Sequence, residues 1–148
     1  MNRVNLVHII ESCSGGSLEY LIQICNFLNE SQKWDIHIIY SRRIDTPLNF
    51  KSRFQENITF HEVFLKREIS ITSDIRGIVQ INKILKQINP EIIHLHSSKA
   101  GFLGRICALK YQKKIIYTPH GFSFMRKDIS TLKKIFFLDV RIYCCPNR

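Results

Sequence analysis

Apolar and polar positions alternate along the chain in blocks that predict strands and helices in turn. Near-continuous apolar runs are typical of buried parallel strands, and they cover residues 4–10, 35–41, 58–65, 91–96 and 114–119. Apolar residues at helical spacing follow the first and third runs: Leu18, Leu21, Ile22, Cys25 and Leu28, then Ile75, Ile78, Val79, Leu85 and Ile88. A third helix is predicted over about residues 99–111.

Residues with capping or breaking chemistry mark the ends of these blocks. Asp74 is expected to cap the second helix and Ser130 a last one, while Asn89-Pro90 ends the second helix. Residues 46–54 form a loop or a short helix. Strands alternating with helices of this length indicate βαβ units with right-handed crossovers. The sequence therefore predicts an α/β fold with a Rossmann-like, doubly wound parallel sheet.

Composition supports one globular domain. Of 148 residues, 45% are hydrophobic and 23% charged, which excludes a disordered chain. No uncharged apolar stretch approaches the roughly 20 residues that cross a bilayer, and Glu11 stops an N-terminal run too short for a signal peptide. The five cysteines include no Cys-x-x-Cys pair, so we expect reduced thiols and a cytoplasmic location.

The net charge of +10 is concentrated in the last third of the chain. Residues 1–98 hold 11 Lys/Arg and 10 Asp/Glu, whereas residues 99–148 hold 11 Lys/Arg against two Asp. This asymmetry suggests nucleic acid, an anionic membrane or a phosphorylated substrate as partner; a solvated basic surface is the alternative. A nucleic-acid partner is disfavoured, because no recognition motif accompanies the charge.

Polar residues cluster where three of the predicted strands end. SCSGGS follows the first strand, HSSK closes the fourth and PHGFSF follows the fifth. In a doubly wound sheet, ligands bind at the carboxyl ends of the strands. The sequence therefore predicts a binding edge built from these three segments.

Gly15 and Gly16 lie between the first strand and the first helix. Glycine there lets the backbone approach a ligand closely, and a helix N-terminus favours an anion. The pair matches neither G-x-G-x-x-G nor the P-loop pattern, so a plain tight turn is the alternative interpretation.

His94 and His96 lie two residues apart in the predicted fourth strand, so their side chains point to the same face. A metal ion would need further ligands, and His120 is a possible third, but no acidic or cysteine ligand accompanies them, so no metal site is predicted. His94 is expected to be a core histidine hydrogen-bonded to the backbone, and His96 lies nearer the binding edge.

The predicted third helix opens with Ser98 and Lys99, where a serine cap and free amides could also bind a phosphate. Arg105 and Lys110 are expected to be exposed. Three small residues are explained by close packing of the helix on the sheet: Ala100, Gly101 and Gly104.

His120, in YTPHGF, follows the fifth strand between Pro119 and Gly121. An imidazole at this edge can donate to a phosphate or sugar hydroxyl, or act as a base. A structural histidine is the alternative.

Taken in order, VNLVHIIESCSGGSLEYLIQICNFL, PEIIHLHSSKAGFLGRICA and KIIYTPHGFSF resemble the N-terminal domain of family 4 glycosyltransferases. The likeness is to bacterial enzymes of capsule, exopolysaccharide and lipopolysaccharide biosynthesis. It implies a domain over residues 1–138, followed by a divergent or truncated tail over 139–148. This domain is one half of a GT-B architecture, in which two Rossmann-like domains face each other across a cleft.

The resemblance also implies roles for individual residues in a retaining enzyme that needs no metal or other cofactor. The catalytic residue is His120, which contacts the transferred sugar. Gly15 and Gly16 face the donor phosphates, and four residues line the acceptor side: His96, Ser98, Lys99 and Arg105. The acceptor is a lipid-linked or other saccharide. The basic surface suits peripheral docking on the inner face of the plasma membrane.

The nucleotide-sugar would bind a second domain carrying an E-x7-E motif, and these 148 residues do not contain one. We therefore expect an acceptor-binding half that is inactive alone. The alternative is a non-catalytic binding subunit that pairs with a separate donor-binding chain.

Overall fold

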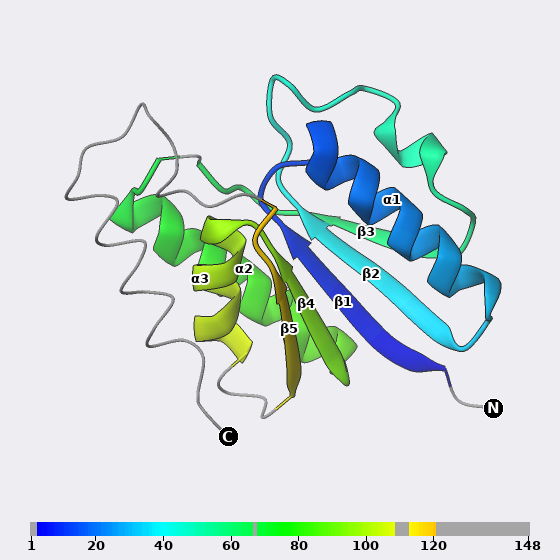
Figure 1. Ribbon diagram of the computed structural model, residues 1–148. Helices are drawn as coiled ribbons and strands as arrows, with labels where there is room; N and C mark the ends of the chain where they lie inside the picture. Colours follow the sequence, from blue (N-terminus) through cyan, green and yellow to red (C-terminus); the bar gives the residue numbers. More distant parts are fainter. Residues whose placement is uncertain (1–2, 67, 109–112, 121–148) are drawn as a thin grey trace.

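The computed structural model describes residues 3–66, 68–108 and 113–120. They form a five-stranded, all-parallel sheet in the order β3-β2-β1-β4-β5, which confirms the predicted α/β fold (Figure 1). The elements in chain order are β1 (Val4–Ile10), α1 (Gly15–Glu30), β2 (Trp34–Tyr40), the 3₁₀ helix η1 (Phe50–Arg53), β3 (Ile58–Glu62), α2 (Ile71–Ile88), β4 (Ile92–His96), α3 (Ser98–Ala108) and β5 (Lys114–Thr118).

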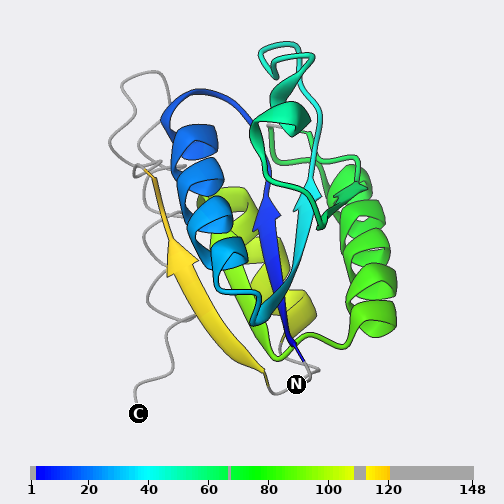
Figure 2. The same cartoon turned by 90° about the vertical axis from the view of Figure 1, so that its right-hand side faces the viewer.

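Helices cover both faces of the sheet and enclose two apolar cores (Figure 1; Figure 2). On one face α1 and η1 pack over side chains that include Ile10, Ile36 and Ile38. On the other, α2 and α3 pack over Val7 and Ile9 of the same central strand. Adjacent residues of β1 thus enter different cores, which is why its sequence is apolar throughout.

Several strand ends differ from the predicted ones by one residue, and two boundaries among the described residues differ by more. The third strand ends at Glu62 instead of residue 65, although Val63 still donates a backbone hydrogen bond to the Tyr40 carbonyl at 2.8 Å. The cap predicted for Asp74 is wrong, because α2 begins one turn earlier with Ser70 as its N-cap residue. Asp74 lies inside the helix and accepts the Ser70 backbone N–H at 3.1 Å.

The far end of α2 follows the prediction. Asn89 adopts a left-handed conformation with φ of 49°, and its N–H donates to the Leu85 carbonyl at 2.8 Å. Two apolar positions used to predict this helix, Ile75 and Val79, are exposed. The buried side of the helix carries Gly77 instead, against which Leu65 packs closely.

Small residues of α3 allow the helix to lie directly on the sheet, as predicted. A Cβ at Gly101 would lie 2.5 Å from Cε2 of Tyr117, and one at Gly104 would clash with Leu95. Cys13, Cys25 and Cys107 are buried thiols, and burial raises the pKa of Cys13 and of Cys25 to about 12.

Several predictions concern parts of the chain outside the described residues: Lys110, the helix capped by Ser130, the segment after His120 and the adjacent Cys144 and Cys145. Among the described residues, no helix combines the length and apolar character needed to span a bilayer.

Candidate functional site

The parallel register brings the ends of three strands together at one edge. Ile10 of β1 pairs with His96 of β4, and His96 pairs with Thr118 of β5. The polar segments that follow these residues therefore start side by side, as the sequence predicts.

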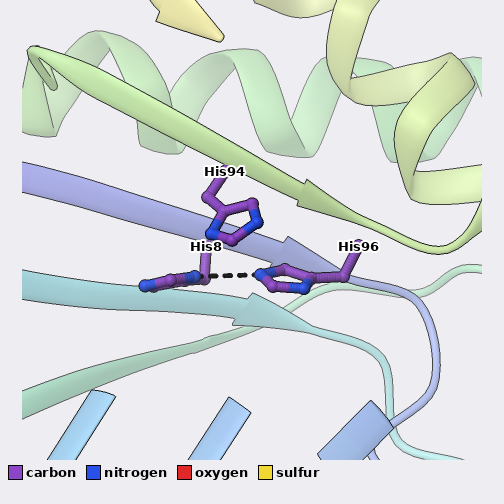
Figure 3. A group of neighbouring side chains, drawn as sticks. All are labelled: His8, His94 and His96. Carbon is purple, nitrogen blue, oxygen red and sulfur yellow. Dashed lines mark hydrogen bonds between the residues drawn. The ribbon is translucent and has the colours of Figure 1, made fainter. Parts of the chain in front are cut away.

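A hydrogen-bonded row of three imidazoles runs from the sheet interior to this edge. His8 Nδ1 lies 2.9 Å from His96 Nε2, and His96 Nδ1 lies 2.8 Å from His120 Nε2. His8 and His96 are fully buried, whereas His120 is partly exposed. Figure 3 shows the side chains of His8 and His96 meeting, with the His94 ring beside them. We call His8, His96 and His120 the histidine row.

Neighbouring side chains contact the row and the adjacent His94. His94 is buried, as expected, and its Nε2 lies 2.8 Å from the Thr118 hydroxyl, a side-chain partner where a backbone one was expected. The Tyr20 ring of α1 lies against the outer end of the row, with its centroid 5.0 Å from that of His120 and 6.0 Å from that of His96.

Burial keeps the imidazoles of this cluster neutral. Desolvation, and next the nearby His94, lower the pKa of His8 to about 3. Desolvation and His120 lower the pKa of His94 to about 4. For His96, desolvation and the three surrounding histidines lower the pKa well below its usual range, and partial burial lowers that of His120. Each ring thus carries one N–H and one lone pair.

Among the described residues, one group could bind a metal ion: His8, His94 and His96 each offer a nitrogen within 4.8 Å of the others. As arranged here, however, the His8 and His96 nitrogens share a proton in a hydrogen bond. A bound ion would have to replace that proton. The geometry is therefore that of a hydrogen-bonded network.

The segment over residues 12–17, which we call the glycine loop, joins β1 to α1 and leaves open space at the start of the helix. Gly15 has φ of +54°, a left-handed conformation that favours glycine, and no atom lies within 4 Å of a Cβ built on Gly15 or Gly16. Ser14 does not cap the helix; its hydroxyl donates to Asp45 at 2.8 Å. The backbone is thus shaped for close approach of a ligand, while binding of donor phosphates there remains a prediction.

Lys99 is engaged inside the protein. Its ammonium lies 2.7 Å from an Asp74 carboxylate oxygen and donates to the carbonyls of Lys66 and Glu68 at 2.5 and 2.6 Å. An ammonium has three N–H donors, so these contacts occupy all of them. Lys99 fastens the segment before α2 to the start of α3, beside Ser98, the partly buried first residue of α3. Contact of Ser98 and Lys99 with an acceptor remains a prediction.

The exposure predicted for Arg105 is wrong, because this residue is only 7% exposed. Its guanidinium carbon lies 4.3 Å from the centroid of the Tyr117 ring of β5. The long arginine side chain stays close to the protein because its planar guanidinium stacks on that aromatic face.

Several residues at this edge were not singled out from the sequence: His8, Tyr20, Thr118, Glu11 and Arg43. Glu11 and Arg43 form a largely buried ion pair just after β1 and β2. His8 lies directly beside His94 in the parallel pair of β1 and β4, a register that no local pattern in the sequence marks. Tyr20 and Arg43 depend on how a helix and a loop pack over the edge, for which the sequence has no local pattern.

The sequence of this chain is similar to one protein family and to known bacterial proteins. A family described as "Glycosyl transferase 4-like" matches residues 13–140. A UDP-Gal:alpha-D-GlcNAc-diphosphoundecaprenol alpha-1,3-galactosyltransferase from Escherichia coli is 35% identical over 86 residues, 57% of this chain and 22% of its own length. An uncharacterized 41.2 kDa protein in the cps region of Klebsiella pneumoniae is 30% identical over 145 residues, 94% of this chain and 37% of its own length.

Solved structures share the fold at low identity. A sucrose-phosphate synthase from Thermosynechococcus elongatus superposes with a TM-score of 0.73 at 12% identity, covering 98% of this chain and 41% of that one. A UDP-GlcNAc 2-epimerase from Methanocaldococcus jannaschii superposes with a TM-score of 0.59 at 13% identity, covering 94% and 37%. The chain thus spans well under half the length of these relatives.

Proposed function

The chain belongs to the glycosyl transferase 4-like family, and from that premise we propose that it is the acceptor-binding half of a GT-B glycosyltransferase. The observation that carries the proposal is the convergence of the glycine loop, the start of α3 and His120 at one sheet edge. The fold alone would not suffice, because an epimerase shares it. Family membership is what favours sugar transfer.

The reaction would move a sugar from a nucleotide-sugar to an acceptor hydroxyl with retention of configuration. The bond from the anomeric carbon to the diphosphate oxygen breaks, a bond to the acceptor oxygen forms, and the hydroxyl proton passes to the departing nucleoside diphosphate. The nucleotide-sugar is a co-substrate, and no metal or other cofactor is proposed. Its binding site would lie on a second domain or a partner chain.

Each predicted site residue has a place in this proposal. His120 contacts the transferred sugar, and the open backbone at Gly15 and Gly16 faces the donor diphosphate. Of the four residues predicted to line the acceptor side, Ser98 keeps that role in the proposal. His96 is fully buried and is instead proposed to support His120 through their hydrogen bond. Lys99 and Arg105 contribute by holding α3 against the neighbouring segment and β5, which follows from their internal contacts.

The substrates are those of bacterial surface polysaccharide biosynthesis. The E. coli relative is described by a UDP-galactose donor and a diphosphoundecaprenol-linked GlcNAc acceptor, and the Klebsiella relative by its place in the cps region. We propose a lipid-linked saccharide acceptor for this chain, reached at the inner face of the membrane. The excess of positive charge after residue 98 would hold the protein on anionic lipid.

A transfer assay tests the proposal. A chimera in which this chain replaces the matching segment of the Klebsiella relative should transfer a labelled sugar from one of a panel of UDP- and GDP-sugars to a polyprenyl-diphosphate-linked acceptor. The chain alone should not, because catalysis needs groups held on both sides of the reacting centre. In the chimera, His120→Ala should lower turnover about 100-fold. A folded chimera that transfers nothing, or undiminished turnover by the variant, would contradict the proposal.

The second candidate is a non-catalytic binding subunit that works with a separate donor-binding chain. It would bind its ligand at the same sheet edge, where β1, β4 and β5 end side by side. Supplying the rest of the Klebsiella relative as a second polypeptide distinguishes the two, since only a subunit designed to pair would restore transfer without a covalent link.

A further inference from the structure

The histidine row has a direction, because each hydrogen bond between two imidazoles holds one proton. His96 is neutral and carries a single N–H, so it donates on one side and accepts on the other. Either every N–H points toward His120 and the binding edge, or every N–H points toward His8 and the interior. The two directions leave different groups at the two ends of the row.

The buried end decides between these directions. His8 Nε2 is inaccessible to solvent and has no hydrogen-bond partner among the described residues. The side chain lies on the face of β1 that also carries Ile10, within the core beneath α1. If the protons pointed inward, an N–H would be orphaned there. Buried N–H groups without a partner are rare in folded proteins, so the bare lone pair is the group to be expected at His8 Nε2.

The opposite end of the row reaches the edge. His120 accepts from His96 at Nε2, so its remaining nitrogen, Nδ1, is the one available to a ligand. His120 is held in a left-handed conformation with φ of 52°, a costly backbone state for a residue other than glycine. Tyr20 packs against the ring from the side of α1. The ring is thus positioned from the interior, from the backbone and from the covering helix.

We infer that His8 and His96 are positioning residues which hold His120 in the Nδ1–H tautomer, so that His120 offers a hydrogen-bond donor at the binding edge. The donor would meet an oxygen of the sugar or phosphate of the substrate, a part of the inference that rests on the proposed function. In this state His120 has no free lone pair and cannot act as the base in the transfer. The acceptor hydroxyl must lose its proton elsewhere.

Tautomers can be measured without any sugar by ¹⁵N NMR of histidine-labelled 148-residue chain at neutral pH. Protonated and bare imidazole nitrogens have distinct shifts, and their couplings to ring protons assign each nitrogen. The inference requires the Nδ1–H form for His8, His96 and His120 alike, although free histidine favours the Nε2–H form. Nε2–H signals for His96 and His120 would mean that the row runs inward and would overturn it.

Two matched variants separate positioning from general structure. His96→Phe keeps the ring but removes the donor to His120, and should convert His120 largely to the Nε2–H tautomer. His94→Phe alters a neighbouring ring on the same strand face that is outside the row, and should leave His120 as it is. If the tautomer of His120 were unchanged in His96→Phe, the inference would be overturned. The same holds if wild type bound one equivalent of zinc with loss of the N–H signals of His8 and His96. None of these results depends on glycosyl transfer.

Discussion

Acid should unfold this protein at a pH where its carboxylates are still ionised, because three neutral histidines are buried together. The pKa of His8 falls to about 3 and that of His94 to about 4, and the pKa of His96 is also far below the ordinary value. In the unfolded chain each should titrate near about 6.5. Since the folded-state pKa values are the lower ones, stability is full above about pH 6.5 and is lost as the pH falls toward the folded-state values.

The magnitude follows from linkage. Between about pH 7.5 and pH 5.5 each histidine becomes roughly nine-tenths protonated in the unfolded chain but stays neutral in the folded one, which costs about 1.4 kcal/mol per group. Three groups give about 4 kcal/mol, a large share of the roughly 5–15 kcal/mol that stabilises a typical domain. Aspartate and glutamate contribute little in this range, because most remain ionised in both states.

Urea denaturation at several pH values measures the effect. The free energy of unfolding of wild type should fall by at least about 4 kcal/mol over this interval, since the lowered pKa values of His61 and His120 add to the loss. That of His94→Phe should fall by about 1.4 kcal/mol less, since one proton fewer is taken up on unfolding. The comparison uses the slope against pH, so a lower overall stability of the variant does not affect it. A wild-type stability that is flat or that rises on acidification would refute the reasoning, as would an unchanged slope in His94→Phe.

Three further predictions concern packing, the Lys99 contacts and charge. Gly101→Ala should lower the free energy of unfolding by about 1–3 kcal/mol in urea denaturation, because the new Cβ would lie 2.5 Å from Tyr117. Gly16→Ala is the control, because no atom lies within 4 Å of a Cβ there. Equal losses of stability in the two variants would contradict the close packing at Gly101. Lys99→Met should cost about 1–3 kcal/mol and speed proteolysis next to residue 68, whereas unaltered cleavage would mean that these contacts do not hold the segment. Binding to phosphatidylglycerol vesicles should weaken steeply with added salt, because charges are screened beyond about 8–10 Å at moderate ionic strength; salt-insensitive binding, or none, would count against membrane docking.

The sequence predicted the features that depend on local pattern. Continuous apolar runs located the strands, and Gly101 and Gly104 indicated where α3 lies against the sheet. Alternation with helices predicted parallel strands, and parallel strands bring the polar residues at their carboxyl ends, among them His96 and His120, to one edge. The order of the strands comes from the structure.

Features that depend on the burial of single side chains were not predictable in this way. Arg105 occupies a position whose exposure the sequence leaves open, and its stacking on Tyr117 requires β5 to lie beside α3. Ile75 and Val79 share the helical spacing of buried residues and yet are exposed. His8 belongs to an apolar strand, and no local sequence pattern shows whether a histidine there forms hydrogen bonds with other histidines or only packs in the core.

The most direct test of the central claim, that this chain is the acceptor-binding half, is a titration of the ¹⁵N-labelled chain with a panel of short-chain polyprenyl-diphosphate-linked saccharides, followed by amide shifts. The claim predicts that one member of the panel causes saturable shifts gathered at His96, Ser98 and His120, and that UDP- and GDP-sugars alone cause none at the same concentration. Shifts confined to another face of the sheet, or saturable binding of a nucleotide-sugar without the acceptor, would contradict it.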